Sequence, residues 1–154
     1  MWPFTPPKEP LNSAKLPIPD TWTAFKGRDP YGKPMIVRAH AGYNKFKGVT
    51  GYAHHVSIAL PLVDSDRQGF PTVSETETLT RIENDICEVF EPGHESLFVA
   101  TITIPGIREF VLYTSNPEGL QQKFDNDLLA RVFTHQAHLK IQPDKDWTIY
   151  NKLF

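Results

Sequence analysis

Of the two histidine pairs in this sequence, one has a spacing that could hold a metal ion. His135 and His138 are three residues apart, and two imidazoles at that spacing can share one metal when both lie on one helix. Here the pair spans the expected end of a helix and the expected start of a strand. His54 and His55 are adjacent on an expected strand, so their side chains face opposite ways. We therefore expect neither a metal site nor a bound cofactor.

The nucleophilic side chains lack the neighbours that would activate them. Cys87 is the only thiol, and the carboxylates of Asp85 and Glu88 beside it would raise its pKa and oppose its reactivity. No serine lies in a G-x-S-x-G nucleophile elbow, and no glycine-rich loop is present that would hold a phosphate. We predict that the protein is not an enzyme, and a cryptic enzyme is kept as an alternative.

Negative charge is concentrated in residues 74–91, SETETLTRIENDICEVFE, which an expected helix would present together. Six acids lie there with a single base, Arg81. One interpretation is a solvated face that aids solubility. The other is a docking surface for a basic protein, such as a nuclease or a toxin, with the charge speeding the encounter. The candidate partner-binding residues are these acids and two aromatic residues near the N-terminus: Glu75, Glu77, Glu83, Asp85, Glu88, Glu91, Trp2 and Phe4.

Basic and aromatic residues alternate in residues 24–48, from AFKGRDPYGK to GYNKFKG. Such interleaving is typical of surfaces that bind single-stranded RNA. The formal net charge of the whole chain is −2, which opposes nucleic-acid binding. RNA binding is therefore the alternative function, and nucleic acid is not the partner we expect.

The bulk composition bounds the kind of protein. A chain of 154 residues with 40% hydrophobic residues is long enough for one domain with its own core. A single cysteine permits no internal disulfide, and the N-terminus lacks the pattern of a secretory signal. The longest apolar stretches are too short to cross a bilayer. We expect a soluble cytoplasmic protein without membrane contact.

The elements that would position these residues can be placed along the chain. Residues 1–20 hold six of the fourteen prolines and are expected to form an arm outside a single domain of residues 21–154. Strands are expected at 21–27, 33–40, 54–64, 96–106, 107–115 and 137–143. One helix is expected at 74–91, begun by a capping box of Ser74 and Glu77, and a second after Asn116.

This order predicts an α+β fold. The elements from residue 54 onward match the ferredoxin-like split βαβ motif, an antiparallel sheet with two helices on one face. The first two strands add an N-terminal β-hairpin. The second face of the sheet needs a cover, which could be the hairpin, the arm, the tail or the second subunit of a homodimer. Trp147 and Tyr150 in the tail are expected to complete the core.

Four stretches resemble a bacterial family, the domain of unknown function six-nine-five. They are Trp22 with Phe25, GFPTVSETETLTRIENDI at 69–86, VATITIPGIREFVLYTS at 99–115, and the closing DKDWTIYNKLF. That family is similar in turn to a ferredoxin-like regulator that binds and inhibits a bacterial ribonuclease. The resemblance implies a non-enzymatic protein-binding module that inhibits or regulates a partner, as a ribonuclease regulator or as an immunity or antitoxin protein.

Overall fold

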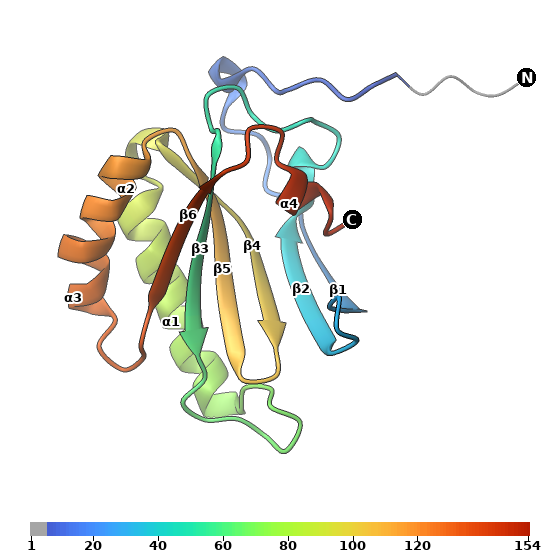
Figure 1. The fold of residues 1–154 in the computed structure, drawn as a ribbon. Coiled ribbons are helices and arrows are strands. Elements are labelled where there is room, and N and C mark those ends of the chain that lie inside the picture. The colour runs from blue at the N-terminus through green and yellow to red at the C-terminus, as the bar shows by residue number, and fades with distance from the viewer. Residues whose placement is uncertain (1–5) are drawn as a thin grey trace, which may run out of the picture.

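A six-stranded antiparallel sheet forms the centre of the computed structural model, which describes residues 6–154 (Figure 1). The strand order is β1-β2-β4-β5-β3-β6, so two hairpins lie side by side and β3 and β6 complete the far edge. The strands are β1 (Trp22–Arg28), β2 (Pro34–His40), β3 (His54–Pro61), β4 (Ser96–Ile104), β5 (Ile107–Thr114) and β6 (His138–Pro143).

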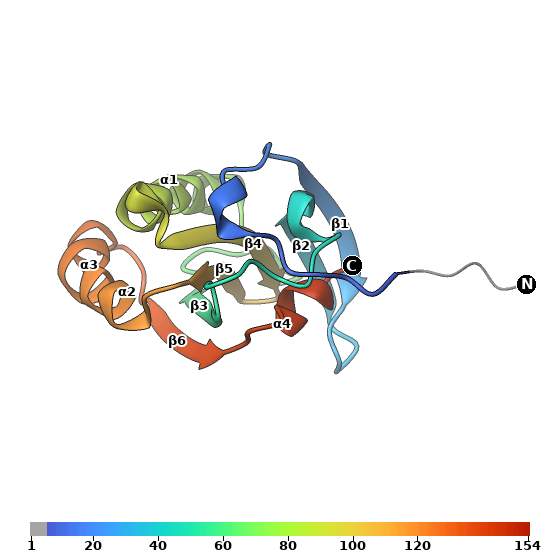
Figure 2. The ribbon, with the colours of Figure 1, turned by 90° about the horizontal axis from the view of Figure 1, so that it is seen from above.

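Helices cover one face of this sheet (Figure 2). The long helix α1 (Val73–Phe90) connects β3 to β4. The connection from β5 to β6 is α2 (Pro117–Lys123), a π-helical turn (Phe124–Leu128) and α3 (Leu129–Arg131). The short helix α4 (Thr148–Asn151) lies on the opposite face, and 3-10 turns occur at Ser13–Lys15, Ala41–Tyr43 and Pro92–His94.

The start of α1 differs from the sequence prediction. Thr72 is the N-cap, and its side-chain oxygen accepts a hydrogen bond of 3.3 Å from the backbone N–H of Glu75. The predicted capping box of Ser74 and Glu77 is therefore wrong, because the N-cap lies two residues earlier than Ser74. Thr72 and Glu75 fit the same T-x-x-E pattern, and the Thr72 hydroxyl also donates to Asp64 at 2.7 Å. A contact from the preceding loop thus selects between two equivalent sequence patterns.

The first hydrophobic core lies between the helices and the sheet. The apolar stripe predicted for α1 is buried there, with Ile86 fully enclosed. Phe110 and Leu112 of β5 face this core, as strand alternation predicts. In the second helical segment Val132 is buried in this core, whereas Leu129 is 41% exposed.

The second core lies on the opposite face and is closed by the C-terminal tail. Trp147 and Tyr150 are fully buried there, which confirms their predicted role. The Trp147 ring stacks on Tyr113 with 4.1 Å between centroids, and its indole N–H donates to the Tyr52 carbonyl at 2.8 Å. Gly48 is required beside it, because a Cβ at that position would lie 2.6 Å from the indole ring.

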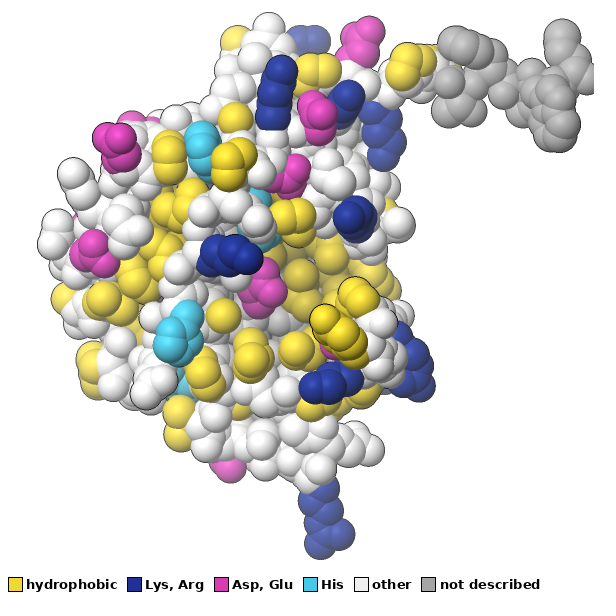
Figure 3. Space-filling model, in the orientation of Figure 1, with side chains coloured by type: hydrophobic (Ala, Val, Ile, Leu, Met, Phe, Trp, Pro, Cys, Tyr) yellow, Lys and Arg dark blue, Asp and Glu magenta, His cyan; other side chains and the backbone are white. Residues whose placement is uncertain are grey.

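The arm packs against the domain over most of its described length. The backbone N–H of Leu11 donates to the Gly48 carbonyl, and the Thr50 N–H donates to the Leu11 carbonyl, each at 2.9 Å. Leu11 is 6% exposed and belongs to the second core. The arm, the tail and the loop between β2 and β3 therefore all contribute to the cover that the sheet needs. Figure 3 shows the hydrophobic side chains that remain visible on this face.

Candidate partner-binding site

The six candidate acids of α1 do not share one surface, because successive helical residues point about 100° apart. Glu75 points inward and is 4% exposed, so its prediction as a partner contact is wrong. Glu83 forms an ion pair with Arg38 of β2. The remaining acids reach solvent to different extents: Glu77, Asp85, Glu88 and Glu91. The negative surface is narrower than the sequence suggests.

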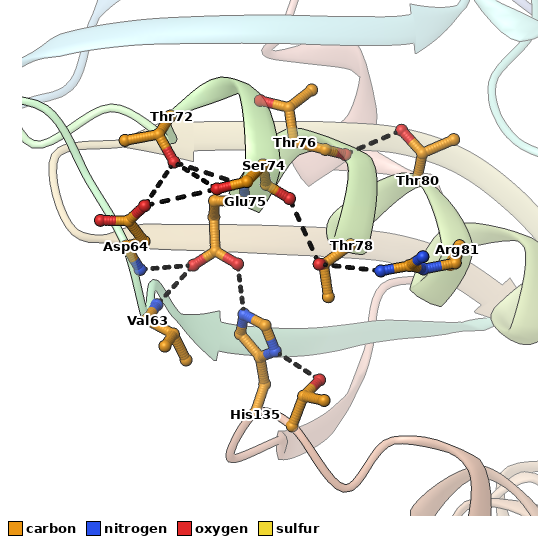
Figure 4. A network of polar contacts seen from close by, with 11 residues as sticks. Val63, Asp64, Thr72, Ser74, Glu75, Thr76, Thr78, Thr80, Arg81 and His135 are labelled. Atoms are coloured by element: carbon orange, nitrogen blue, oxygen red, sulfur yellow. Dashed lines mark hydrogen bonds and ion pairs between the residues drawn. The ribbon is translucent and has the colours of Figure 1, made fainter.

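Glu75 instead joins the start of α1 to two loops (Figure 4). One carboxylate oxygen accepts hydrogen bonds from the backbone N–H groups of Val63 and Asp64. The other lies 2.7 Å from Nε2 of His135, whose Nδ1 is 2.9 Å from the Thr134 hydroxyl. The side chains of Glu75 and His135 are only 3% and 2% exposed. This buried pair stabilises the loops by satisfying backbone donors.

Two of the solvent-facing acids already have a basic neighbour. Arg131 of α3 lies 3.3 Å from the Asp85 carboxylate and 2.6 Å from that of Glu88. Such a partly exposed pair contributes about 0–1 kcal/mol, so it holds these acids only weakly. Within residues 6–154, Glu77 and Glu91 form no ion pair.

A pocket of about 350 Å³ lies beside the C-terminal half of α1. Glu83, Cys87 and Glu91 form its helical wall, since residues four apart lie on one helix face. The arm segment 16–20 forms the opposite wall, passing between α1 and β2 in the view of Figure 2. The ends of β2 and β4 form the floor. Four segments that are distant in sequence thus enclose one pocket.

Arg38 and Trp22 lie side by side on the inner wall of the pocket. The guanidinium carbon of Arg38 is 4.9 Å from the centroid of the Trp22 ring, within the range of a cation–π interaction. The same guanidinium pairs with Glu83. The β1–β2 register, with Trp22 opposite His40 and Ala24 opposite Arg38, places these side chains on one face of the hairpin.

His40 is buried at the other end of the pocket, with 3% of its surface exposed. Its Nδ1 accepts a hydrogen bond of 3.1 Å from the Gly42 N–H, so the ring hydrogen lies on Nε2 in this arrangement. Nε2 is 3.3 Å from the Asp20 carboxylate, which terminates the arm. His40 therefore fixes the arm to the pocket and does not have a free nitrogen for other chemistry.

Burial and the surrounding carboxylates raise the pKa values of two pocket residues. The pKa of Tyr43 is raised to about 12, mainly by burial and to a smaller extent by the carboxylates of Glu91 and Asp20. Burial also raises the pKa of Cys87 to about 12, with a hydrogen bond to Glu91 acting in the same direction. The thiol is thus protonated at neutral pH, as predicted, but the causes are burial, Glu91 and Glu83 and not the flanking Asp85 and Glu88. Burial is the larger cause of both shifts, and the carboxylate of Glu91 adds to each.

The other candidate features are not brought together. His135 is buried with Glu75, whereas His138 is exposed on β6. Among residues 6–154, no group of three or more His, Cys, Asp or Glu side chains is arranged to hold a metal. No helix in that range is long and apolar enough to cross a membrane. Trp2 and Phe4 lie outside the described residues.

The basic and aromatic stretch of residues 24–48 does not form a stacking surface. Tyr43 is buried in the second core, and Phe25 and Phe46 pack against that core. Tyr31, at the hairpin turn, is 90% exposed and is the one aromatic side chain of this stretch that could stack on a base. Most aromatic side chains of this stretch therefore pack in the core and are not available to stack on RNA bases.

Sequence reasoning did not single out Arg38, His40 and Trp22 as site residues. Strand alternation and the turn at Asp29 contain enough information to place them on one face of the hairpin. Their distance from α1 could not be read in this way, because 45 residues separate Arg38 from Glu83. Only the pairing of β2 with β4 brings the hairpin beside that helix.

The fold and the pocket together define an antiparallel α+β protein with an acidic, aromatic-walled site beside its long helix. The chain belongs to a family of unknown function (DUF695), which it matches over residues 20–154. This confirms the resemblance seen in the sequence, and the match begins where the arm ends. No curated protein and no solved structure matches the chain.

Proposed function

We propose that this protein is a non-enzymatic binding module that inhibits or regulates a basic protein partner. The observation that carries the proposal is the placement of Glu77 and Glu91, which extend negative charge along the exposed side of α1 to the acidic pocket. Complementary charge speeds encounter and selects partners. A ribonuclease or a toxin would present the required basic surface, because such proteins are basic where they hold nucleic acid.

We also propose that the part of the chain from β3 to β6 has a ferredoxin-like split βαβ fold, which the N-terminal hairpin extends at β4. The strand order β4-β5-β3-β6 supports this, with α1 joining β3 to β4 and the second helical segment joining β5 to β6. Such a fold is shared with the ribonuclease-binding regulator that the family resembles, and it also suits an immunity or antitoxin protein.

The test begins with affinity capture of the tagged chain from its native cell and identification of bound proteins by mass spectrometry. The complex is then rebuilt from purified components, and its affinity is measured by calorimetry. Reversing Glu77 and Glu91 to Lys should raise the Kd at least about tenfold, because neither carboxylate forms an ion pair within residues 6–154. The partner's own activity should fall as the complex forms.

The matched control reverses two exposed acids on another helical segment. Asp125→Lys with Asp127→Lys changes the net charge by the same amount but lies in the π-helical turn after α2. This variant should bind the partner like the wild type. The proposal fails if no stoichiometric partner is captured, or if the control weakens the complex as much as the α1 variant does.

A further inference from the structure

The pocket beside α1 has an unbalanced charge. Asp20, Glu83 and Glu91 contribute three carboxylates, and Arg38 contributes the one permanent positive charge in the lining. His40 accepts a hydrogen bond at Nδ1 and is therefore neutral in this arrangement, and His94 lies at the exposed rim. Arg108 acts on Glu83 from outside the lining, so the three carboxylates face two guanidinium groups and an excess of one negative charge remains. A ligand that balances this excess must be cationic.

Arg38 shows how this pocket holds a guanidinium group. Its planar head lies over the Trp22 ring and pairs with the Glu83 carboxylate. Toward Tyr43, which is itself buried, the carboxylates of Glu91 and Asp20 lie without a basic partner among the described residues beyond His40. The pocket therefore contains one occupied arginine position and a second set of carboxylates beside it.

We propose that the pocket receives an arginine side chain of the partner protein, whose guanidinium binds the carboxylates of Glu91 and Asp20. This inference rests on the proposed function. Arginine fits better than lysine because its planar, weakly hydrated head can bond two carboxylates at once. Leu16, Pro17 and Ile18 line the arm side, where they can contact the apolar stem of such a side chain.

The dimensions and the electrostatics of the pocket support this occupant. A volume of about 350 Å³ is at the lower limit of pockets that enclose small ligands, which suits one long side chain and a few waters. The raised pKa values of Tyr43 and Cys87 have contributions from Glu91, which a bound cation would offset. Arginine binding should therefore lower the pKa of the Cys87 thiol.

The direct test uses the full chain and a small probe, N-acetyl-arginine amide, followed by NMR. The Trp22 indole N–H and the Gly42 backbone N–H should shift and saturate, with a Kd on the order of 1 mM for a fragment of this size. The control probe is N-acetyl-citrulline amide, which has the same shape but no charge. At ionic strength matched with sodium chloride, it should bind at least about tenfold more weakly.

Two matched variants locate the site. Glu91→Gln keeps the size of the side chain and removes its charge, and it should weaken arginine binding several-fold. Glu118→Gln makes the same change at an exposed residue in the first turn of α2, outside the pocket, and should leave the Kd unchanged. Equal binding of both probes, the absence of saturable shifts, or an unchanged Kd in Glu91→Gln would each overturn the inference.

Failure of the arginine site and failure of the proposed protein-binding function would give different results. If a partner is captured but the arginine probe does not bind, the protein-binding function stands and the arginine site is excluded. If the probe saturates the pocket but no partner is captured, the occupant is not a protein and the proposed function fails. If both succeed, replacing the partner's arginines by lysine in turn should identify one whose loss reproduces the effect of Glu91→Gln.

Discussion

His55 should make the stability of this protein fall as the pH drops below neutral. Its side chain lies on β3 and is 3% exposed, and its ring centroid is 5.5 Å from that of Tyr113 in an edge-on arrangement. Nδ1 is 3.4 Å from Gln142 Nε2, and Nε2 has no hydrogen-bond partner among residues 6–154. Burial lowers the pKa of His55 to about 4, the carboxylate of Asp144 opposes this shift, and Lys140 adds to it.

The sign and size of the effect follow from this pKa. The unfolded chain takes up a proton on His55 near its ordinary pKa of 6.5, whereas the folded protein does so only near pH 4. Between these values the unfolded state binds more protons, so the free energy of unfolding decreases as the pH falls. The two pKa values predict a loss of about 2 kcal/mol between pH 7 and pH 5 from this residue alone.

The assay is urea unfolding at pH 7 and pH 5, followed by tryptophan fluorescence. His55→Phe keeps a flat ring and removes both the titrating group and the unpaired buried nitrogen. It should lose about 2 kcal/mol less than the wild type over this pH range. His138→Gln, at an exposed position, is the control and should keep the wild-type pH dependence. An equal pH dependence in the wild type and His55→Phe would refute the reasoning.

Three further predictions concern the buried groups. Trp147→Ala should lower the free energy of unfolding by about 3–5 kcal/mol in urea titrations, because it leaves a cavity at the centre of the second core. The control Phe133→Ala, at a residue that is 85% exposed, should change this free energy by less than about 0.5 kcal/mol. Glu75→Ala should cost about 3 kcal/mol in the same assay, since it leaves two backbone donors and His135 without their partner; a loss below 1 kcal/mol would show that the network is dispensable. The Cys87 thiol should react with a maleimide at pH 8 at least about a hundredfold more slowly in the folded protein than in urea, because its pKa in the folded protein is about 12. Equal rates in the two states would contradict the burial of this residue.

Most of the elements could be predicted from the sequence because their signals are local. The alternation of Phe110 and Leu112 with Val111 and Tyr113 assigns each side of β5 to a different core, and the structure confirms it. Local patterns failed where two readings were equally good, as at the start of α1. There the hydroxyl of Thr72 binds Asp64 of the preceding loop, a contact between residues eight apart that helix patterns do not encode.

The candidate site was less predictable from the sequence, because it depends on contacts between residues that are distant along the chain. Charge composition identified α1 as acidic, but it could not tell that Glu75 points at His135, sixty residues further along the chain. It also could not tell that Glu83 meets Arg38. Each of these partners was hidden by sequence separation, because a contact between distant segments depends on strand pairing and on helix rotation together.

The sequence by itself determined the elements, the two-sided burial of the sheet and the excess of acids on α1. These properties arise from side-chain periodicity and composition, which are local. Only the tertiary structure decided which acids remain available and that a pocket exists. The pocket is made when β2 pairs with β4 and the arm crosses from Leu11 to Asp20, so that carboxylates from two distant segments come to share one space. The repulsion between these carboxylates lowers the stability of the fold, and a bound cationic side chain would reduce that repulsion.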